Sequence, residues 1–400
     1  MYGPAVVSGN QGGTPASGQP SLVSPADIAD AAERLRGVIR PTPAVPADAV
    51  GKLVGRALWL KPEQLQRAGS FKIRGAYNMI SRLPSGSSVV AASAGNHAQG
   101  VALAAALTGC SATIFMPATA PLPKVEATRS YGAEIRFVDG GVDECITAAQ
   151  ELVSGGAVWV PPFDDPLILA GQGTIGLELL TEIPGLATVV VPVGGGGLVS
   201  GIAAAVRPAD VHVIGVDVVD ATRTMADGIA VKRLSALTRT HVDALVDDVV
   251  TVTEEQISAA VVLLLERAKA VVEPAGAVAV AAVLAGLVPD HAGPVCCVLS
   301  GGNVDPLLLT KLIDHGLSAA GRYLVLQVLL SDRPGALAGL LTHIGSAGLN
   351  VLSVEHHRAG LDLDVDEVEV LLTLETRDPE HREEVVADLR AAGYAVELVR

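Results

Sequence analysis

One lysine lies in a sequence context that could make its amine reactive. Lys72 stands within Gly69–Ala76, two residues after Ser70, and serine favours the position just before a helix. The apolar residues that follow at helical spacing predict that Lys72 belongs to the first turn of this helix. Most isolated lysines lie in solvent, but Phe71 and Ile73 on either side would hold this one partly out of water. Such burial lowers the pKa of an amine and suits imine formation.

A second segment combines small residues with polar side chains. Ser93–Gly100 follows a predicted strand and opens a predicted helix, so its backbone N–H groups would lie at a helix N-terminus, where anions such as a carboxylate bind. An ordinary turn between a strand and a helix would explain its glycine and asparagine. The residues that favour a ligand site instead are Ser93, Gly95, Asn96 and His97. His97 alone is more typical of a hydrogen-bonded structural histidine, and we assign it no role in proton transfer.

A third segment is an unbroken run of glycines. Gly194, Gly195, Gly196 and Gly197 precede Leu198, again between a predicted strand and a predicted helix. Each glycine destabilises a regular element by roughly 0.5–1 kcal/mol. Backbone amides that surround a phosphate would justify this cost. A nicotinamide fingerprint fits poorly because the G-x-G-x-x-G spacing fails, and a flexible loop is the alternative.

Short apolar runs and alanine-rich helical patterns alternate from Pro25 to about Asn303. Several runs are apolar at successive positions, as strands that are covered on both faces must be. The alternation predicts a doubly wound α/β fold, in which ligands bind beyond the carboxyl ends of the strands. The segments described above lie at such ends, and so does Ser300–Asn303. The predicted strands are Ser88–Ala94, Ala112–Pro117, Ala133–Asp139, Ala157–Pro161, Thr188–Val193, His212–Val218, Val249–Val252 and Val295–Leu299.

The last 79 residues, 322–400, form a different pattern. Strands and helices are predicted in the order βαββαβ, which describes a small ferredoxin-like module. A hinge is expected at Ala319–Gly321. The predicted strands are Tyr323–Leu330, Asn350–Arg358, Glu367–Glu375 and Ala395–Val399, and the helices run from about Ala336 to Ala347 and from Pro379 to Ala392.

Composition excludes several classes of partner. The chain has 43 acidic and 28 basic residues and a net charge of −15, which repels nucleic acids and anionic membranes. Residues 1–24 are rich in Gly, Ser, Pro and Gln and lack a basic start and an apolar stretch, so a flexible tail is expected rather than a targeting segment. The four cysteines show no disulfide or metal-ligand spacing, and Cys296 and Cys297 are expected to be buried apolar residues. These features favour a cytoplasmic protein, and no metal site is predicted.

Taken together, the motifs resemble the threonine dehydratase branch of the tryptophan synthase β-like pyridoxal-phosphate enzymes. The resemblance runs from about Ser24 to Leu317 and includes Pro161–Asp165, Gly171–Thr174 and Glu273–Ala277. It implies two doubly wound lobes of the fold type II architecture over residues 25–318. The C-terminal module, 322–400, resembles an ACT domain, a regulatory fold that binds amino acids between paired copies.

The resemblance also implies roles for individual residues. Lys72 would hold pyridoxal 5′-phosphate (PLP) covalently and then act as the base for the Cα proton. The backbone of Gly194–Leu198 would bind the cofactor phosphate, Asn96 the ring hydroxyl and Ser300 the pyridine nitrogen, while Phe71 would pack near the ring. The substrate carboxylate would be bound by Ser93, Gly95, Asn96 and His97.

The expected reaction is deamination of L-threonine to 2-oxobutanoate and ammonia, with L-serine to pyruvate as a secondary activity. Ser300 cannot keep the pyridine nitrogen fully protonated, so a long-lived carbanion would be poorly stabilised and elimination is favoured. Racemases of the family have a second serine as the opposite base, and this chain has Ala94 there. A serine racemase or dehydratase, and a catalytically weak amino acid sensor, are the alternatives.

The ACT-like module is expected to bind an effector near Gly335 and Asn350. The sequence Asp332–Gly335 would place backbone N–H groups at a helix start, where a carboxylate can bind. A dimerisation module with an empty site is the alternative. The enzyme is expected to form a homodimer or homotetramer and to serve in threonine breakdown or isoleucine biosynthesis.

Overall fold

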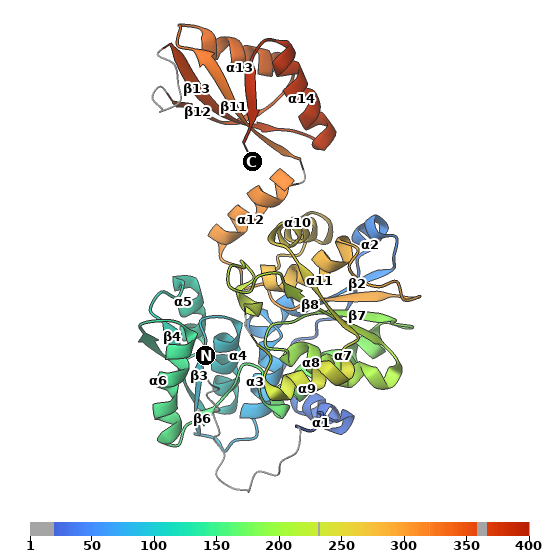
Figure 1. Cartoon of the computed structure of the whole chain (residues 1–400). Coiled ribbons are helices and arrows are strands. Elements are labelled where there is room, and N and C mark those ends of the chain that lie inside the picture. Colours follow the sequence, from blue (N-terminus) through green and yellow to red (C-terminus); the bar gives the residue numbers. More distant parts are fainter. Residues whose placement is uncertain (1–19, 231–232, 320, 358–365, 400) are drawn as a thin grey trace, which may run out of the picture.

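The computed structural model describes residues 20–230, 233–319, 321–357 and 366–399, which form three β-sheets covered by helices (Figure 1). Most of the predicted tail, 1–24, lies outside these ranges, and so do one residue of the predicted hinge Ala319–Gly321 and the last residue of the predicted strand Asn350–Arg358. Within the described ranges no helix combines the length and apolar character that a membrane crossing requires.

The smaller lobe contains a four-stranded parallel sheet. Its order is β5 (Glu134–Val138), β4 (Ser111–Pro117), β3 (Ser88–Ala92) and β6 (Val158–Trp159). Helices α4 (Asn96–Thr108), α5 (Leu122–Ser130) and α6 (Val142–Ser154) belong to the same lobe (Figure 1). Residues Val89 and Ala91 of β3 face the cluster that includes α4, whereas Val90 and Ala92 face α6, so the central strand is covered on both faces.

The larger lobe contains a six-stranded sheet. Its order is β1 (Val45–Pro46), β2 (Leu58–Pro62), β10 (Val295–Leu299), β7 (Thr188–Pro192), β8 (His212–Val218) and β9 (Asp248–Val252). Only the β1–β2 pair is antiparallel among these described strands. The eight strands predicted up to Leu299 are confirmed, while β1 and β2 were not predicted. The doubly wound fold class is therefore confirmed.

Helices cover both faces of this sheet. Val190 and Cys297 face helix α11 (Pro274–Leu284), and Val189 and Cys296 face helices α7 (Pro166–Glu182) and α8 (Gly197–Val206). Every residue of β7 and β10 is buried as a result. The expectation that Cys296 and Cys297 are buried apolar residues is confirmed.

Glycines let the helices behind the sheets approach one another closely. A Cβ on Gly171 of α7 would lie 2.6 Å from the Cα of Gly75 in helix α3 (Lys72–Ile80). A Cβ on Gly201 of α8 would lie 2.2 Å from the carbonyl oxygen of Leu169 in α7. Helix α3 is thus fixed against α7, and α7 against α8, with no room for a larger residue at these crossings.

The C-terminal module is a four-stranded antiparallel sheet with order β12 (Val351–His357), β13 (Glu367–Glu375), β11 (Tyr323–Ser331) and β14 (Ala395–Leu398). Alternate residues of β11 are buried, and they pack with helices α13 (Ala336–Ser346) and α14 (Pro379–Ala391) in an apolar core. Helix α12 (Pro306–Ala319) connects the lobes to this module (Figure 1). The predicted βαββαβ order is confirmed as β11 (Tyr323–Ser331), α13 (Ala336–Ser346), β12 (Val351–His357), β13 (Glu367–Glu375), α14 (Pro379–Ala391) and β14 (Ala395–Leu398).

Candidate active site

Two of the motifs identified in the sequence are joined by backbone hydrogen bonds. The N–H of Phe71 donates to the carbonyl oxygen of Ser300 at 3.1 Å, and the N–H of Gly302 donates to that of Gly69 at 2.9 Å. The residues before helix α3 therefore pair with the residues that follow strand β10. This pairing fixes the start of the Lys72 helix at the carboxyl edge of the large sheet, where ligands of doubly wound folds bind.

Lys72 is a partly buried amine with a depressed pKa. Its Nζ donates a hydrogen bond to the carbonyl oxygen of Pro162 at 2.9 Å and lies 5.2 Å from the centroid of the Phe71 ring. Burial lowers the pKa of Lys72 to about 8, and the charge of Glu273 opposes this shift. A Cβ on Gly100 would lie 3.1 Å from the carbonyl carbon of Lys72, so helix α4 contacts this turn directly. The amine is thus fixed in position and easily deprotonated.

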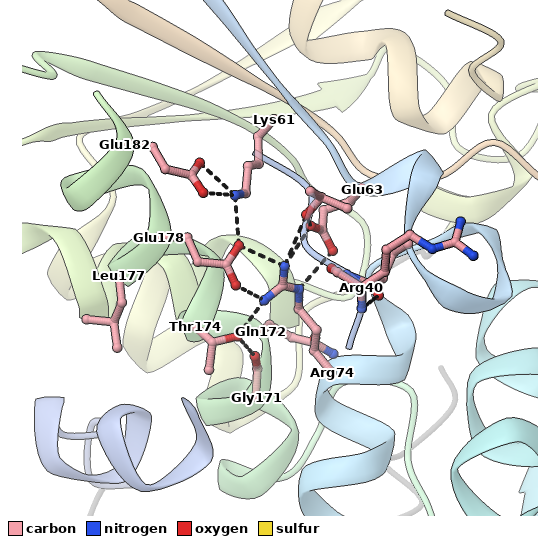
Figure 2. Close-up of polar contacts among 12 residues, drawn as sticks. Arg40, Lys61, Glu63, Arg74, Gly171, Gln172, Thr174, Leu177, Glu178 and Glu182 are labelled. Carbon is pink, nitrogen blue, oxygen red and sulfur yellow. Dashed lines mark hydrogen bonds and ion pairs between the residues drawn. The ribbon is translucent and has the colours of Figure 1, made fainter. Parts of the chain in front are cut away.

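The opposite side of helix α3 is held by a buried ion network (Figure 2). Arg74 pairs with both oxygens of Glu63 at 2.8 Å and with Glu178 at 2.6 and 2.9 Å. Lys61 pairs with Glu178 at 2.7 Å and with Glu182 at 2.9 Å. The side chains of Arg74, Glu63 and Lys61 are fully buried. This network ties the Lys72 helix to α7 and to strand β2 two residues beyond the reactive amine.

The turn between β3 and α4 contains the polar residues that the sequence indicated. The Ser93 hydroxyl accepts a hydrogen bond from the N–H of Gly95 at 3.1 Å, and helix α4 begins at Asn96 without a side-chain cap. Nothing lies within 4 Å of the position a Cβ would take on Gly95, so a ligand can approach the backbone there. The N-terminus of α4 is therefore available to an anion.

His97 lies in the first turn of helix α4, and its ring is hydrogen-bonded to the protein. Its Nε2 lies 2.9 Å from the carbonyl oxygen of Val160, to which it can only donate. Burial, together with the nearby charge of Lys72, lowers the pKa of His97 to about 3. The ring is neutral in the physiological range, which agrees with the interpretation that it transfers no proton.

The glycine loop, Gly194–Leu198, presents backbone donors at the start of helix α8. Gly196 has a φ of +84° and leads into the helix without a side-chain cap. Within the part of the chain that the structure describes, the N–H groups of Gly194–Leu198 have no hydrogen-bond partner. The atoms of Phe163 occupy the space that a Cβ on Gly195 would need, at 2.1 Å. The loop thus requires glycine and leaves its amides free for an anion such as a phosphate.

Comparison with known proteins places this site in a family. Residues 35–301 match the model of the family described as pyridoxal-phosphate dependent enzyme, and residues 324–393 match the ACT domain. The chain belongs to the pyridoxal-phosphate-dependent enzymes. It is a fold type II member of that family and carries a C-terminal ACT domain, as the sequence predicted.

Two relatives match nearly the whole chain. The L-threonine ammonia-lyase of Geobacter sulfurreducens is 46% identical over 396 residues, covering 93% of this chain and 98% of that protein. The L-threonine ammonia-lyase of Thermotoga maritima is 44% identical over 402 residues, covering 94% and 100%. The structure of maize serine racemase has a TM-score of 0.70 and 33% identity and covers 74% of this chain and 99% of its own.

The described residues fit PLP. Lys72 supplies an amine that can join an aldehyde, and the unpaired amides of the glycine loop suit a phosphate. Ser300 is buried at the end of β10, and its Oγ lies 3.5 Å from the carbonyl oxygen of Ala275, too far for a strong hydrogen bond. That hydroxyl is able to donate a hydrogen bond to a ring nitrogen instead. The individual roles remain predictions, while the need for PLP follows from the family.

One residue of the site received no role from the sequence. Glu273 is buried, and its Oε1 accepts a hydrogen bond from Nδ2 of Asn96 at 2.6 Å. Burial, with a smaller contribution from the charge of Asp227, raises the pKa of Glu273 to about 7. Its place in Glu273–Ala277, a segment of the resemblance, was the available signal. Its contact with Asn96, 177 residues away, could not be read from that segment.

The two predicted effector residues of the ACT domain lie on either side of helix α13 in the chain, Gly335 before it and Asn350 after it. Gly335 has a φ of +93° and precedes α13, and nothing lies within 4 Å of the position that a Cβ would take on it. Asn350 donates through Nδ2 to Glu375 at 3.2 Å. Two N–H groups of the expected anion site already donate to backbone carbonyls, those of Asp332 and Arg333. Fewer N–H groups before α13 are therefore available to bind a carboxylate than the sequence suggested.

Proposed function

We propose that this chain is a threonine ammonia-lyase that converts L-threonine to 2-oxobutanoate and ammonia and acts more slowly on L-serine. The observation that carries the proposal is Lys72, a partly buried lysine with a pKa lowered to about 8 whose amine contacts Pro162. The next residue, Phe163, packs against the loop of unpaired backbone amides. The names of the two relatives that match nearly the full chain support the same substrate. PLP supplies an aldehyde for the lysine and a ring that withdraws electrons from the substrate.

The roles that we propose for the residues of the site follow from their positions. The unpaired amides of Gly194–Leu198 and the dipole of α8 hold the cofactor phosphate. Lys72, with its lowered pKa, is the base that takes the Cα proton once its amine is released. The N-terminus of α4, with the small residues Ser93 and Gly95, holds the substrate carboxylate. Fixing the carboxylate orients the Cα–H bond toward Lys72, a positioning effect that supplies several kcal/mol of the barrier reduction.

The remaining assignments concern the cofactor ring. Asn96 would bond the ring hydroxyl, Phe71 would pack near the ring, and Ser300 would meet the pyridine nitrogen. The Phe71 ring already lies near the Lys72 amine, which supports its place beside the ring. A serine would leave the pyridine nitrogen of the cofactor without a counter-charge, and this would favour elimination.

The structural likeness to maize serine racemase gives the second candidate function. In this chain the small-lobe turn has Ala94 where a racemase has its second base, and alanine carries no proton. Chiral chromatography after prolonged incubation with L-serine should therefore show pyruvate and no appreciable D-serine. Comparable rates for the two products would favour racemisation instead.

Regulation and setting form the last part of the proposal. We assign the catalytic domain to residues 25–318 and the regulatory ACT domain to residues 322–400, with Gly335 and Asn350 near an amino acid effector site. Pairing of ACT domains makes the enzyme a homodimer or homotetramer. Isoleucine or valine is the effector expected in isoleucine biosynthesis, and a different signal is expected in threonine breakdown. The free thiols of all four cysteines suit the reducing cytoplasm, where we place the enzyme.

The test is the reaction itself. Purified protein reconstituted with PLP should release 2-oxobutanoate from L-threonine in step with ammonia. Lys52→Ala, a change at an exposed lysine, should leave the rate unchanged. Cofactor binding without release of a 2-oxo acid from threonine or serine would contradict the proposed activity and favour the amino acid sensor.

A further inference from the structure

Asn303 is a side chain that contacts two of the motifs at once. It follows strand β10, and its Nδ2 donates to the carbonyl oxygen of Ala68 at 2.8 Å and to Oδ1 of Asn96 at 2.7 Å. A longer contact of 3.4 Å reaches Oε1 of Gln99 in the same helix as Asn96. One amide group thus joins the end of β10, the turn before the Lys72 helix and the start of α4.

The chemistry of its partners fixes the direction of these hydrogen bonds. The carbonyl oxygen of Ala68 can only accept, so the atom of Asn303 that faces it must be the amide nitrogen. That nitrogen also faces Asn96, so the Asn96 atom at 2.7 Å must be its oxygen. The amide nitrogen of Asn96 then points toward Glu273, whose oxygen accepts at 2.6 Å. Both ends of the chain of hydrogen bonds therefore select one orientation of the Asn96 amide.

The turn that Asn303 holds has an unusual backbone. Ala68 has a φ of +60°, and Gly69 has a φ of +70°. A non-glycine residue in this region is strained and persists only where its surroundings hold it. A Cβ on Gly69 would lie 2.3 Å from Oδ1 of Asn303, so the asparagine fills the space that the glycine leaves. This turn ends three residues before Lys72.

We propose that Asn303 is a positioning residue that fixes the Asn96 amide with its nitrogen available as a donor to the ring oxygen of the cofactor. The inference rests on the proposed role of Asn96. With a donor in this place, the ring oxygen is stabilised in its negatively charged form. If Asn96 rotated, its oxygen would face the ring oxygen and would favour the protonated hydroxyl. Asn303 would thereby select the ionisation state of the bound cofactor through its hydrogen bond to Asn96.

The test compares variants reconstituted with PLP. Asn303→Asp replaces the donor with an acceptor of the same shape, and Asn303→Ala removes it without adding charge. Asn78→Ala is the matched control, because Asn78 is a buried asparagine of α3 whose Nδ2 donates to the carbonyl oxygen of Leu167 at 2.7 Å, outside the site. The absorbance of the lysine-bound cofactor, the affinity for PLP and the melting temperature are measured for each protein.

Both Asn303 variants should move absorbance from the long-wavelength band of the charged ring oxygen to the short-wavelength band of the hydroxyl, Asn303→Ala by less because Glu273 still accepts from Asn96. Their affinity for PLP should fall about 10- to 100-fold, the effect of losing a hydrogen bond to a charged group. Asn78→Ala should lower the melting temperature and keep the wild-type spectrum and affinity. Should Asn303→Asp fail to fold, the uncharged Asn303→Ala decides the matter.

Wild-type band proportions and PLP affinity in both Asn303 variants would overturn this inference and leave the proposed function intact. A wild-type protein that forms no lysine-bound cofactor would instead contradict the proposed function, so the two failures are distinguishable.

Discussion

The catalytic lobes and the ACT domain bury different kinds of side chain. The lobes enclose charged groups that are at most 5% exposed, including Lys61, Glu63, Arg74 and Glu273. In the described part of the ACT domain the buried side chains are apolar, apart from Thr376. Burying charges is costly unless they are paired, and their replacement by apolar residues is often neutral or stabilising. Burial of charged groups therefore lowers the stability that the lobes could otherwise have, but it fixes these groups in position. The ACT domain is stabilised by an apolar core.

This difference matches the role that we propose for each region. A reactive amine must be partly removed from water and held at one position, and the network behind Lys72 does this through helix α3 (Figure 2). An amino acid sensor needs a stable sheet and an accessible surface, and it needs no side chain of altered pKa. Mutations placed in one region or the other test whether the two regions differ in this way.

The largest effect is expected at Lys72. Lys72→Ala removes both the amine that holds the cofactor and the proposed base, so turnover of L-threonine should fall by more than about a thousandfold. Effector binding by the ACT domain should survive because that domain has its own core. Steady-state kinetics with saturating PLP measure the change. A rate within tenfold of the wild type would contradict the role of Lys72.

The next largest effect is on stability and should distinguish the two regions. Arg74→Met leaves Glu63 buried without its partner and should lower the free energy of unfolding by about 3–5 kcal/mol. The matched change in the ACT domain is Arg377→Met, at an exposed pair with Glu384, where less than about 1 kcal/mol is expected. Thermal denaturation in a calorimeter measures the free energy of unfolding of both variants. Equal losses of stability in the two variants would show that the buried ion network contributes little to the stability of the lobes.

Much of this site could be predicted from the sequence, because its parts are local. The Lys72 helix start, the Ser93–His97 turn and the glycine loop each consist of consecutive residues whose types indicate their chemistry. The topology then brings them together, since the turns follow parallel strands and lie at one edge of each sheet.

The partners of these motifs could not be predicted in the same way. Arg74 meets Glu178 across 104 positions, and Asn96 meets Glu273 across 177. No local pattern encodes such pairs. Strand β2 was missed for a related reason, because Lys61 and Pro62 interrupt its apolar pattern, and Lys61 is buried only because α7 supplies two glutamates.

A smaller effect is expected on the pH dependence of cofactor attachment to Lys72. Attachment of PLP requires the neutral amine, so its rate in the apoenzyme should rise with pH around about 8, well below the value of 10.5 for a lysine in water. The negative charge of Glu273 raises the pKa of Lys72, so Glu273→Gln should lower that pKa and move the profile to lower pH. Stopped-flow absorbance measures the rate.

The control for this prediction is Glu151→Gln, at an exposed glutamate of α6, which should leave the profile unchanged. A midpoint near 10 in the wild type would show that burial does not lower the pKa of Lys72. A shift to higher pH in Glu273→Gln would contradict the effect assigned to the Glu273 charge.

The smallest effect on turnover is expected in the ACT domain. Gly335→Ala places a methyl group in open space but strains a backbone with a φ of +93°, so it should weaken effector binding at the start of α13. Turnover without effector should stay within about twofold, because coupling between sites is typically only ~1–3 kcal/mol. Calorimetric titration of the full-length enzyme with the twenty amino acids measures binding. No heat from any of them, with unchanged threonine kinetics, would make the domain purely structural.

The most direct test of the central claim is the location of the cofactor. Wild-type enzyme reconstituted with PLP is reduced with borohydride, digested and mapped by mass spectrometry. We expect the reduced cofactor on Lys72, whose amine is free of carboxylate partners in the described structure. Attachment to another lysine, such as Lys61 or Lys124, or no covalent adduct at all, would contradict it.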